Sequence, residues 1–212
     1  FVGHPSIDAI ASRTEVSDEI FRKENQLSDK PIIALLPGSR KQEISKMLSI
    51  MLSVVKDFPD YQFVIAGAPS QEYEFYKTFL TNENVKFISN KTYDLLSHSH
   101  AALVTSGTAT LETALFNVPE VVCYKGSYIS YQIAKRIITL KYISLVNLIM
   151  DKEVVKELIQ EELNTKNLKI ELEKILNSES RAVLLNNYTE LKQKLGGEGA
   201  SKKTAELIVN TL

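Results

Sequence analysis

The sequence is poor in the residues that crosslink small proteins. Its 212 residues include one cysteine, three histidines and no tryptophan. The single cysteine, Cys123, cannot form an intramolecular disulfide, and no Cys/His cluster has the spacing of a zinc site. A chain of this length buries roughly 70% of its unfolded surface on folding. We therefore expect a hydrophobic core that needs no disulfide, structural metal or cofactor, and the single cysteine suits a reducing compartment.

Net charge and long apolar runs are equally scarce. The 25 Lys and Arg residues nearly balance the 26 Asp and Glu residues, which leaves a formal net charge of -1. This balance gives no basic footprint for nucleic acid, so no nucleic-acid partner is predicted. The longest apolar runs, such as 63–68, are far shorter than the about 20 residues that span a bilayer. Any membrane contact is expected to be peripheral.

The first residues, Phe-Val-Gly-His-Pro, include neither an initiator methionine nor the charged and apolar regions of a signal peptide. This beginning predicts that the chain is a segment of a longer protein.

Short apolar runs alternate with amphipathic stretches from Pro31 onward. The runs are rich in Val and Ile and are bounded by Gly, Pro, Asn or Ser, which favours buried strands over helix fragments. Strands are predicted at 32–36, 61–66, 85–88, 101–105 and 121–124, with a weaker sixth at 143–146. Helical patterns fall at 44–58, 71–80, 92–97, 109–116 and 131–140. This alternation predicts an α/β fold with a Rossmann-like, doubly wound parallel sheet.

The two ends of the chain lack this alternation. Residues 1–30 are polar, and we expect an interdomain lead-in segment with at most one short helix. The sheet domain is predicted to occupy residues 31–150. After it the strand signal stops, and residues 151–212 are predicted to be helices that pack on or beside the sheet, at 154–160, 168–176, 181–195 and 202–212.

Open parallel sheets bind ligands beyond the carboxyl ends of their strands, which directs attention to two polar turns. The first, Gly38-Ser39-Arg40, follows the first strand and precedes a helix. Gly38 permits a tight turn, and Ser39 with Gln42 fits a capping box. Arg40 would place its guanidinium beside the positive end of the helix, which suits a phosphate or diphosphate. A capped helix start without any ligand explains the same residues.

The second turn, Ser106-Gly107-Thr108, follows the fourth strand and also precedes a helix. Its small residues let a ligand approach the backbone, and its hydroxyls can donate to phosphate oxygens, although simple N-capping is the alternative. Glu112, one turn into the helix, could accept hydrogen bonds from ribose hydroxyls or serve only as a favourable charge near the helix N-terminus. Two such turns on one sheet favour a nucleotide site.

Two further residues are predicted on the ligand side of the sheet. Tyr124 ends the fifth strand and Asn147 follows the weak sixth strand, with a core tyrosine and a simple turn as the alternatives. The sequence contains no Gly-x4-Gly-Lys-Ser/Thr loop, no Gly-x-Gly-x-x-Gly fingerprint and no Gly-x-Ser-x-Gly elbow. P-loop kinases and ATPases, ordinary dinucleotide dehydrogenases and α/β-hydrolases are therefore not expected.

The order and spacing of five motifs carry a family resemblance that covers the chain from Phe1 to at least Gln160. The motifs are Gly3-His4-Pro5 with Asp8, Leu36-Pro37-Gly38-Ser39-Arg40 with Glu43-Ile44, Ser106-Gly107-Thr108-Ala109-Thr110-Leu111-Glu112, Pro119 with Val121-Val122-Cys123-Tyr124, and Ser144-Leu145-Val146-Asn147. Each alone is weak, because other glycosyltransferases and sugar-nucleotide epimerases of the same fold have related turns, but the set is specific. The chain resembles the carboxyl-terminal, donor-binding half of lipid-A-disaccharide synthases.

This resemblance implies an inverting glycosyltransferase with the glycosyltransferase-B fold, which needs no metal ion. The family moves 2,3-diacylglucosamine from UDP-2,3-diacylglucosamine to 2,3-diacylglucosamine 1-phosphate. Arg40 would face the diphosphate, and Glu112 and Asn147 would contact the nucleotide or the sugar. The residues implied in UDP-sugar binding are Gly38, Ser39, Arg40, Glu43, Ser106, Gly107, Thr108, Glu112, Tyr124 and Asn147.

The resemblance also sets expectations for the surroundings of the protein. Family members work at the inner membrane surface, so a cytoplasmic, peripheral location is implied, and a homodimer is one assembly that it allows. The acceptor site and the general base of an inverting transfer are expected in an amino-terminal half that these residues do not match. The chain alone is therefore expected to be inactive. A fragment of a UDP-N-acetylglucosamine epimerase and a stand-alone nucleotide-sugar-binding module without catalysis are the alternatives.

Overall fold

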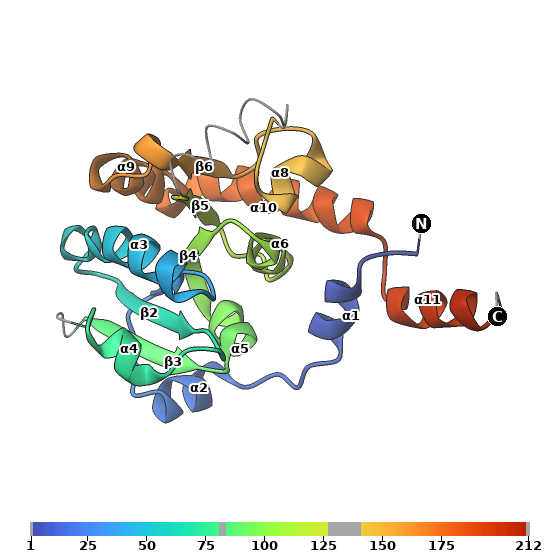
Figure 1. Ribbon diagram of the computed structural model, residues 1–212, viewed down its shortest axis with the longest axis horizontal. Helices are drawn as coiled ribbons and strands as arrows, with labels where there is room; N and C mark the ends of the chain where they lie inside the picture. Colours follow the sequence, from blue (N-terminus) through green and yellow to red (C-terminus); the bar gives the residue numbers. More distant parts are fainter. Residues whose placement is uncertain (1, 81–83, 127–140, 211–212) are drawn as a thin grey trace.

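A computed structural model of the chain describes residues 2–80, 84–126 and 141–210 (Figure 1). The described residues form one six-stranded sheet in the order β3-β2-β1-β4-β5-β6, and every neighbouring pair is parallel. The strands are β1 (Ile32–Leu36), β2 (Gln62–Gly67), β3 (Val85–Ser89), β4 (Ser99–Thr105), β5 (Glu120–Tyr124) and β6 (Lys156–Ile159). The predicted α/β, doubly wound fold is confirmed, and the strand order reverses between β1 and β4.

Helices cover both faces of the sheet, which explains why the central strands β1 and β2 are buried at every position. Figure 1 shows α3 (Lys41–Leu52) and α9 (Thr165–Leu176) on one side, with α5 (Thr92–Ser97) and α6 (Thr108–Leu115) on the other. Ile33 and Leu35 belong to the large core cluster beneath α3, whereas Ile32 and Ala34 belong to a second cluster with residues of α5. Every residue of β1 is buried.

The helix that follows β1 has the predicted apolar stripe. Its buried side chains are Ile44, Met47, Leu48 and Met51, and the stripe continues through Val55 and Phe58 in and after the 3-10 turn Val55–Asp57. Helix α4 (Tyr73–Lys77) is shorter than the helix expected at 71–80. The helix expected at 131–140 lies outside the described residues.

The sixth strand is not where the sequence suggested. The segment expected as a strand at 143–146 instead begins α8 (Leu145–Met150), and Ser144 caps that helix by accepting a hydrogen bond from the Asn147 N–H. The strand is β6, within the segment expected to be a helix at 154–160. Pairing with β5 and burial of Glu157 by tertiary contacts override the local helical pattern.

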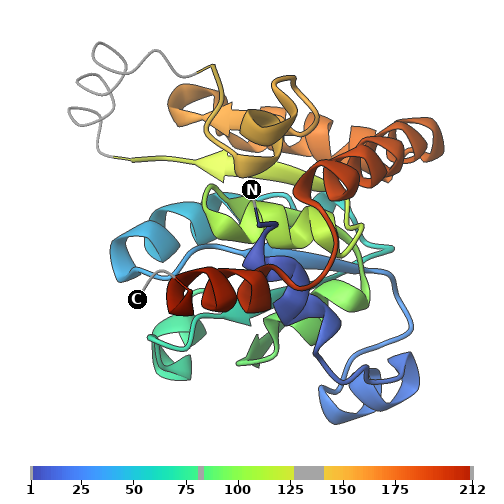
Figure 2. The ribbon, with the colours of Figure 1, turned by 90° about the vertical axis from the view of Figure 1, so that its right-hand side faces the viewer.

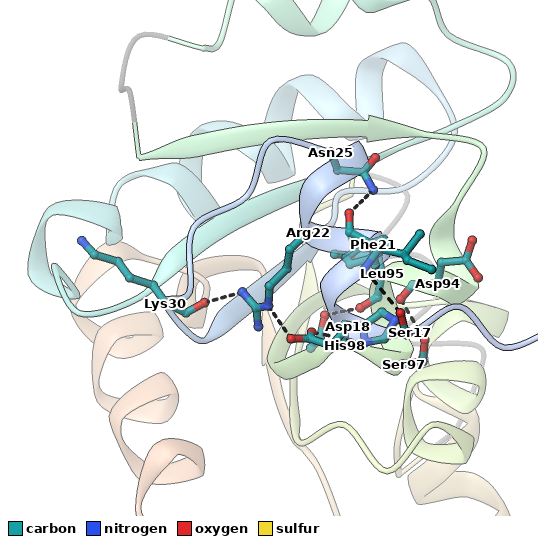
Figure 3. Close-up of polar contacts among 12 residues, drawn as sticks. Ser17, Asp18, Phe21, Arg22, Asn25, Lys30, Asp94, Leu95, Ser97 and His98 are labelled. Carbon is teal, nitrogen blue, oxygen red and sulfur yellow. Dashed lines mark hydrogen bonds and ion pairs between the residues drawn. The ribbon is translucent and has the colours of Figure 1, made fainter.

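The segment before β1 contains two short helices, α1 (Pro5–Ala11) and α2 (Asp18–Glu24), where at most one was expected. Helix α2 is fixed to the sheet by Phe21, which is 1% exposed and stacks on His98 with ring centroids 4.7 Å apart. The Arg22 guanidinium binds the Asp18 carboxylate and the carbonyl of Lys30 (Figure 3). The lead-in segment is thus packed on the sheet domain.

The last three helices pack in two different places, α9 and α10 (Ser178–Leu195) on the core and α11 (Ala200–Val209) on α1. α9 packs on α10, and α10 buries Leu184, Tyr188, Leu191 and Leu195 against the core. α11 instead lies beside α1, as Figures 1 and 2 show. The helices predicted at 168–176, 181–195 and 202–212 are present, with the last described as far as residue 210.

Candidate functional site

A cleft of about 480 Å³ lies at the carboxyl ends of β1 and β4, where the strand order reverses. This is where a doubly wound sheet binds its ligands. Eight of the ten predicted site residues line it, namely Gly38, Ser39, Arg40, Glu43, Ser106, Gly107, Thr108 and Glu112. A second hollow of about 370 Å³ adjoins it and shares Arg40, Glu43 and Thr105.

The turn after β1 is held by a contact between Gly38 and Glu43. Gly38 has a φ of +102°, a conformation that favours glycine, and a Cβ atom there would collide with the Glu43 carboxylate. Glu43 Oε2 accepts a hydrogen bond from the Ser39 N–H at 3.1 Å. The predicted capping box was wrong, because Arg40 rather than Ser39 is the N-cap of α3 and Glu43 reaches back to the turn. Glu43 therefore shapes the loop from within the site.

Helix α3 begins without a side-chain cap. Its N-cap residue Arg40 makes no side-chain hydrogen bond to the backbone of the first turn. The Arg40 side chain is exposed at the cleft and pairs with no carboxylate of the described residues. Unsatisfied N–H groups and the helix dipole make such an end favourable for an anion, and a guanidinium adds donors of the same sign.

Helix α6 also begins without a side-chain cap. Its N-cap is Gly107, whose backbone is extended, and a Cβ atom at Gly107 would meet no other atom within 4 Å. The protein's own packing does not require glycine here, so the open space belongs to the cleft. Ser106 is fixed in place, since its N–H donates to the Cys123 carbonyl at 3.1 Å and its hydroxyl to the Ile143 carbonyl at 3.0 Å.

Thr105, the last residue of β4, is a feature that sequence reasoning missed. It is 4% exposed, and its hydroxyl has no hydrogen-bond partner among the described residues. It lines both the cleft and the adjoining hollow. A buried hydroxyl without a partner costs free energy, so a ligand that bonds to it would be favoured. Its place as the last strand residue before the Ser106 turn was the available signal.

Glu112 lies one turn into α6 and is held by a residue from another helix. The Tyr93 hydroxyl on α5 donates to Glu112 Oε1 at 2.9 Å. Burial, and then the hydrogen bond to Glu112, raise the pKa of Tyr93 to about 12, so the hydroxyl stays a donor at neutral pH. Tyr93 was not predicted from the sequence.

The adjoining hollow is rich in cations. Tyr124 lies here, at the end of β5, with Lys125 beside it. Lys41 and Lys46 of α3 and the shared Arg40 complete the positive lining, and Glu43 is the single carboxylate among the described lining residues. This arrangement can neutralise an anion with more than one charge.

Asn147 is not part of the cleft lining. It is 0% exposed, and its Oδ1 accepts from the N–H groups of Val154 and Val155 at 2.7 and 2.9 Å. Its Nδ2 donates to the Val155 carbonyl and to Glu157. The strand expected before Asn147 was wrong, because Asn147 sits in α8 and fastens β6 to that helix.

The family model for lipid-A-disaccharide synthetase matches residues 1–211. The chain belongs to this family. A lipid-A-disaccharide synthase from Persephonella marina is 35% identical over 220 residues, which cover 98% of this chain and 58% of the relative. One from Syntrophus aciditrophicus is 34% identical over 220 residues, covering 100% of this chain and 57% of the relative. The chain thus spans less than two thirds of these relatives.

Solved structures with a similar fold are more distant in sequence. The complex of Staphylococcus aureus MnaA with UDP superposes with a TM-score of 0.65 at 16% identity, over 98% of this chain and 53% of that chain. WaaG, a glycosyltransferase involved in lipopolysaccharide biosynthesis, gives a TM-score of 0.60 at 16% identity, over 97% of this chain and 54% of that chain. At these identities the likeness shows the fold alone, so the family assignment rests on the closer synthases.

The described residues show neither a membrane-spanning helix nor a cluster of metal ligands. No helix among them is both long and apolar enough to cross a membrane. No group of three or more His, Cys, Asp or Glu side chains in the same residues is arranged to hold a metal ion.

Proposed function

We propose that this synthetase-family chain binds the UDP part of UDP-2,3-diacylglucosamine and supplies the donor half of the lipid A disaccharide reaction. The observation that carries the proposal is the convergence of two uncapped helix N-termini, those of α3 and α6, on one cleft at the switch point of the sheet. A diphosphate has the charge and the acceptor oxygens to satisfy both ends at once. The UDP-bound and UDP-sugar-bound structures of similar fold support the same choice of ligand.

The cleft and the adjoining hollow offer places for the diphosphate, the ribose and the sugar of the donor. The diphosphate would lie between Arg40 and the Gly107 turn, with the ribose hydroxyls toward Glu112. The sugar would extend toward Tyr124 and Lys125 in the adjoining hollow. As the bond to the sugar breaks, negative charge grows on the leaving UDP, and fixed cations with helix N-termini stabilise it.

The chemical step needs groups outside those assigned here. In the proposed reaction a hydroxyl of 2,3-diacylglucosamine 1-phosphate attacks the anomeric carbon from the face opposite UDP, the bond to UDP breaks, and the configuration inverts. A general base must accept the proton of the attacking hydroxyl. We place that base and the acceptor site in the part of the longer synthases that this chain does not span, and we expect UDP binding here without turnover. Peripheral association with the cytoplasmic surface of the inner membrane is part of the same proposal.

Isothermal titration calorimetry of the 212-residue chain with UDP tests the binding proposal. Arg40→Ala should weaken UDP binding about tenfold or more, the loss expected for a hydrogen bond between charged groups. Lys203→Ala is the matched control, because it removes an exposed cation on α11, away from the cleft. Unchanged affinity in Arg40→Ala, or an equal loss in Lys203→Ala, would contradict the site.

The reaction is tested with the longer protein that contains this chain. The proposal expects disaccharide formation from the two diacylated glucosamine substrates and no epimerisation of UDP-N-acetylglucosamine. Epimerised product without disaccharide would favour the epimerase alternative over the synthase.

A further inference from the structure

One oxygen of the Glu112 carboxylate is bonded within the protein, and the residue also lines the cleft. Its Oε1 accepts the Tyr93 hydroxyl at 2.9 Å, and none of the described residues donates a hydrogen bond to its Oε2. Glu112 lines the cleft, whereas Tyr93 is not among the described residues that line it. Tyr93 therefore contacts the carboxylate from behind and leaves one oxygen for a ligand.

Tyr93 is itself fixed by residues from two other parts of the fold. Its ring packs on Phe116, at the end of α6, with centroids 5.3 Å apart. The Arg13 guanidinium, from the segment between α1 and α2, lies 5.1 Å from the centroid of the same Phe116 ring. Arg13 Nη1 also approaches the Tyr93 carbonyl and Asp94 Oδ1, each at 3.3 Å.

These contacts form a support for the Glu112 carboxylate that draws on α5, the end of α6 and the segment between α1 and α2. The Arg13 side chain is 15% exposed, so the support is largely shielded from water. A glutamate side chain without it would populate several rotamers, and ordering one of them on binding costs conformational entropy. A carboxylate held before the ligand arrives avoids that cost.

We propose that Tyr93 is a positioning residue, which orients Glu112 so that its free oxygen meets the ribose hydroxyls of the donor, and that Arg13 and Phe116 hold Tyr93 in place. This inference rests on the proposed UDP site and adds residues to it. Through Arg13, the segment before β1 would also help to position the donor site.

The test compares UDP with 2′-deoxy-UDP and 3′-deoxy-UDP by calorimetry, in the wild-type chain and in Tyr93→Phe. The ring and its packing remain in Tyr93→Phe, and only the hydroxyl is lost. We expect the variant to bind UDP about fivefold more weakly while its affinity for the deoxy analogue that lacks the Glu112 contact changes little. Discrimination between ribose and deoxyribose should therefore shrink, which a merely structural role would not produce. Tyr73→Phe is the matched control, because Tyr73 is an exposed tyrosine on α4.

A double-mutant cycle provides the second readout. Tyr93→Phe should have no further effect in a Glu112→Ala background if it acts through that carboxylate. An equal loss for UDP and both analogues, or an additive loss in the Glu112→Ala background, would overturn the inference. If the wild-type chain binds no UDP at all, the proposed function fails. If the wild type discriminates ribose and Tyr93→Phe discriminates equally well, only the positioning role fails.

Discussion

The Asp8 carboxylate accepts a hydrogen bond from the Ser201 N–H at 2.7 Å, although the two residues are 193 positions apart in the chain. The other Asp8 oxygen accepts from the Gly199 N–H at 2.6 Å. α11 begins at this point and has no cap from its own N-cap residue, so a side chain of α1 caps it instead. The two ends of the described chain are joined by this contact, which Figure 2 shows as α1 lying against α11.

The contact should make the order of α11 depend on pH. Hydrogen bonds from Ser201, and then from Gly199, lower the pKa of Asp8 from an ordinary 3.8 to about 2. A lowered folded-state pKa means that the stabilisation is complete above pH 3.8 and is lost as the pH falls toward 2. Asp8→Asn should therefore reduce amide protection in α11 at neutral pH, measured by hydrogen exchange, while protection in β4 is unchanged.

The control for this prediction is Asp29→Asn, which alters an exposed aspartate in the loop before β1. The difference in protection between wild type and Asp8→Asn should shrink as the pH approaches 2. A difference that stays constant with pH, or equal loss in the Asp29 variant, would show that the charge of Asp8 does not hold α11.

Asn147 gives a prediction that separates a structural role from the predicted ligand role. Its amide makes four hydrogen bonds to the segment from Val154 to Glu157, all of them buried or partly buried. Asn147→Ala should lower the free energy of unfolding by ~2–4 kcal/mol, because it strands several buried partners. UDP affinity should remain within about twofold of wild type, since the Asn147 side chain is fully buried and lines neither the cleft nor the adjoining hollow.

Urea unfolding and calorimetry on the same variant decide between the two roles. Asn187→Ala is the control for stability, because Asn187 is half-buried and its side chain bonds, among the described residues, to the Val183 carbonyl of its own helix alone. Wild-type stability together with a large loss of UDP affinity would restore Asn147 to the donor site.

The sequence predicted five of the six strands because apolar residues predominate in each of them, including β3, where Lys86 is exposed among Val85, Phe87 and Ile88. It missed β6 because that strand is Lys-Glu-Leu-Ile, in which charged and apolar residues are mixed. Glu157 is buried there because its carboxylate accepts from the N–H groups of Ile143 and Ser144, from the Ser144 hydroxyl and from Asn147. Those partners lie 10 to 14 positions away in the chain, so helical or strand periodicity cannot predict the contacts.

The site residues likewise fall into those that the sequence could predict and those that depend on tertiary packing. The turns at Gly38 and Ser106 were predictable, because the rule that places ligands beyond strand ends needs only the strand order. Tyr93 was not, since its contact with Glu112 depends on how α5 packs beside α6. The capping box at Ser39 failed for a related reason: Glu43, rather than Gln42, lies at the right distance from the turn once the helix begins at Lys41.

Burial of the Glu120 carboxyl should make the stability of the protein fall as the pH rises. It is 0% exposed, and neither carboxylate oxygen has a hydrogen-bond partner among the described residues. Burial raises the pKa of Glu120 well above its ordinary value near 4.5. The folded state therefore keeps a proton that the unfolded state releases, and the free energy of unfolding should fall as the pH rises above about 4.5, until the folded-state pKa is passed.

Glu120→Gln removes this titration and keeps the shape of the side chain. The variant should exceed wild type in stability, by a margin that grows by up to ~1.4 kcal/mol per pH unit within that range. Urea denaturation between pH 5 and 8 measures it, with exposed Glu198→Gln as the control. A margin that does not change with pH would mean that Glu120 is ionised in the folded protein.

Two glycines of the cleft should respond in opposite ways to the same substitution. Gly38 has a φ of +102° and faces the Glu43 carboxylate, so Gly38→Ala should cost ~1–3 kcal/mol of stability through backbone strain and steric conflict.

Gly107 has an extended backbone and open space where a Cβ atom would lie. Gly107→Ala should therefore leave stability within ~0.5 kcal/mol of wild type. Its methyl group would occupy the approach to the α6 N-terminus, and UDP affinity should fall about tenfold, the cost of losing a hydrogen bond to a charged group. Urea unfolding and calorimetry on both variants separate the effects, and a Gly107→Ala chain that binds UDP as tightly as wild type would remove the α6 N-terminus from the site.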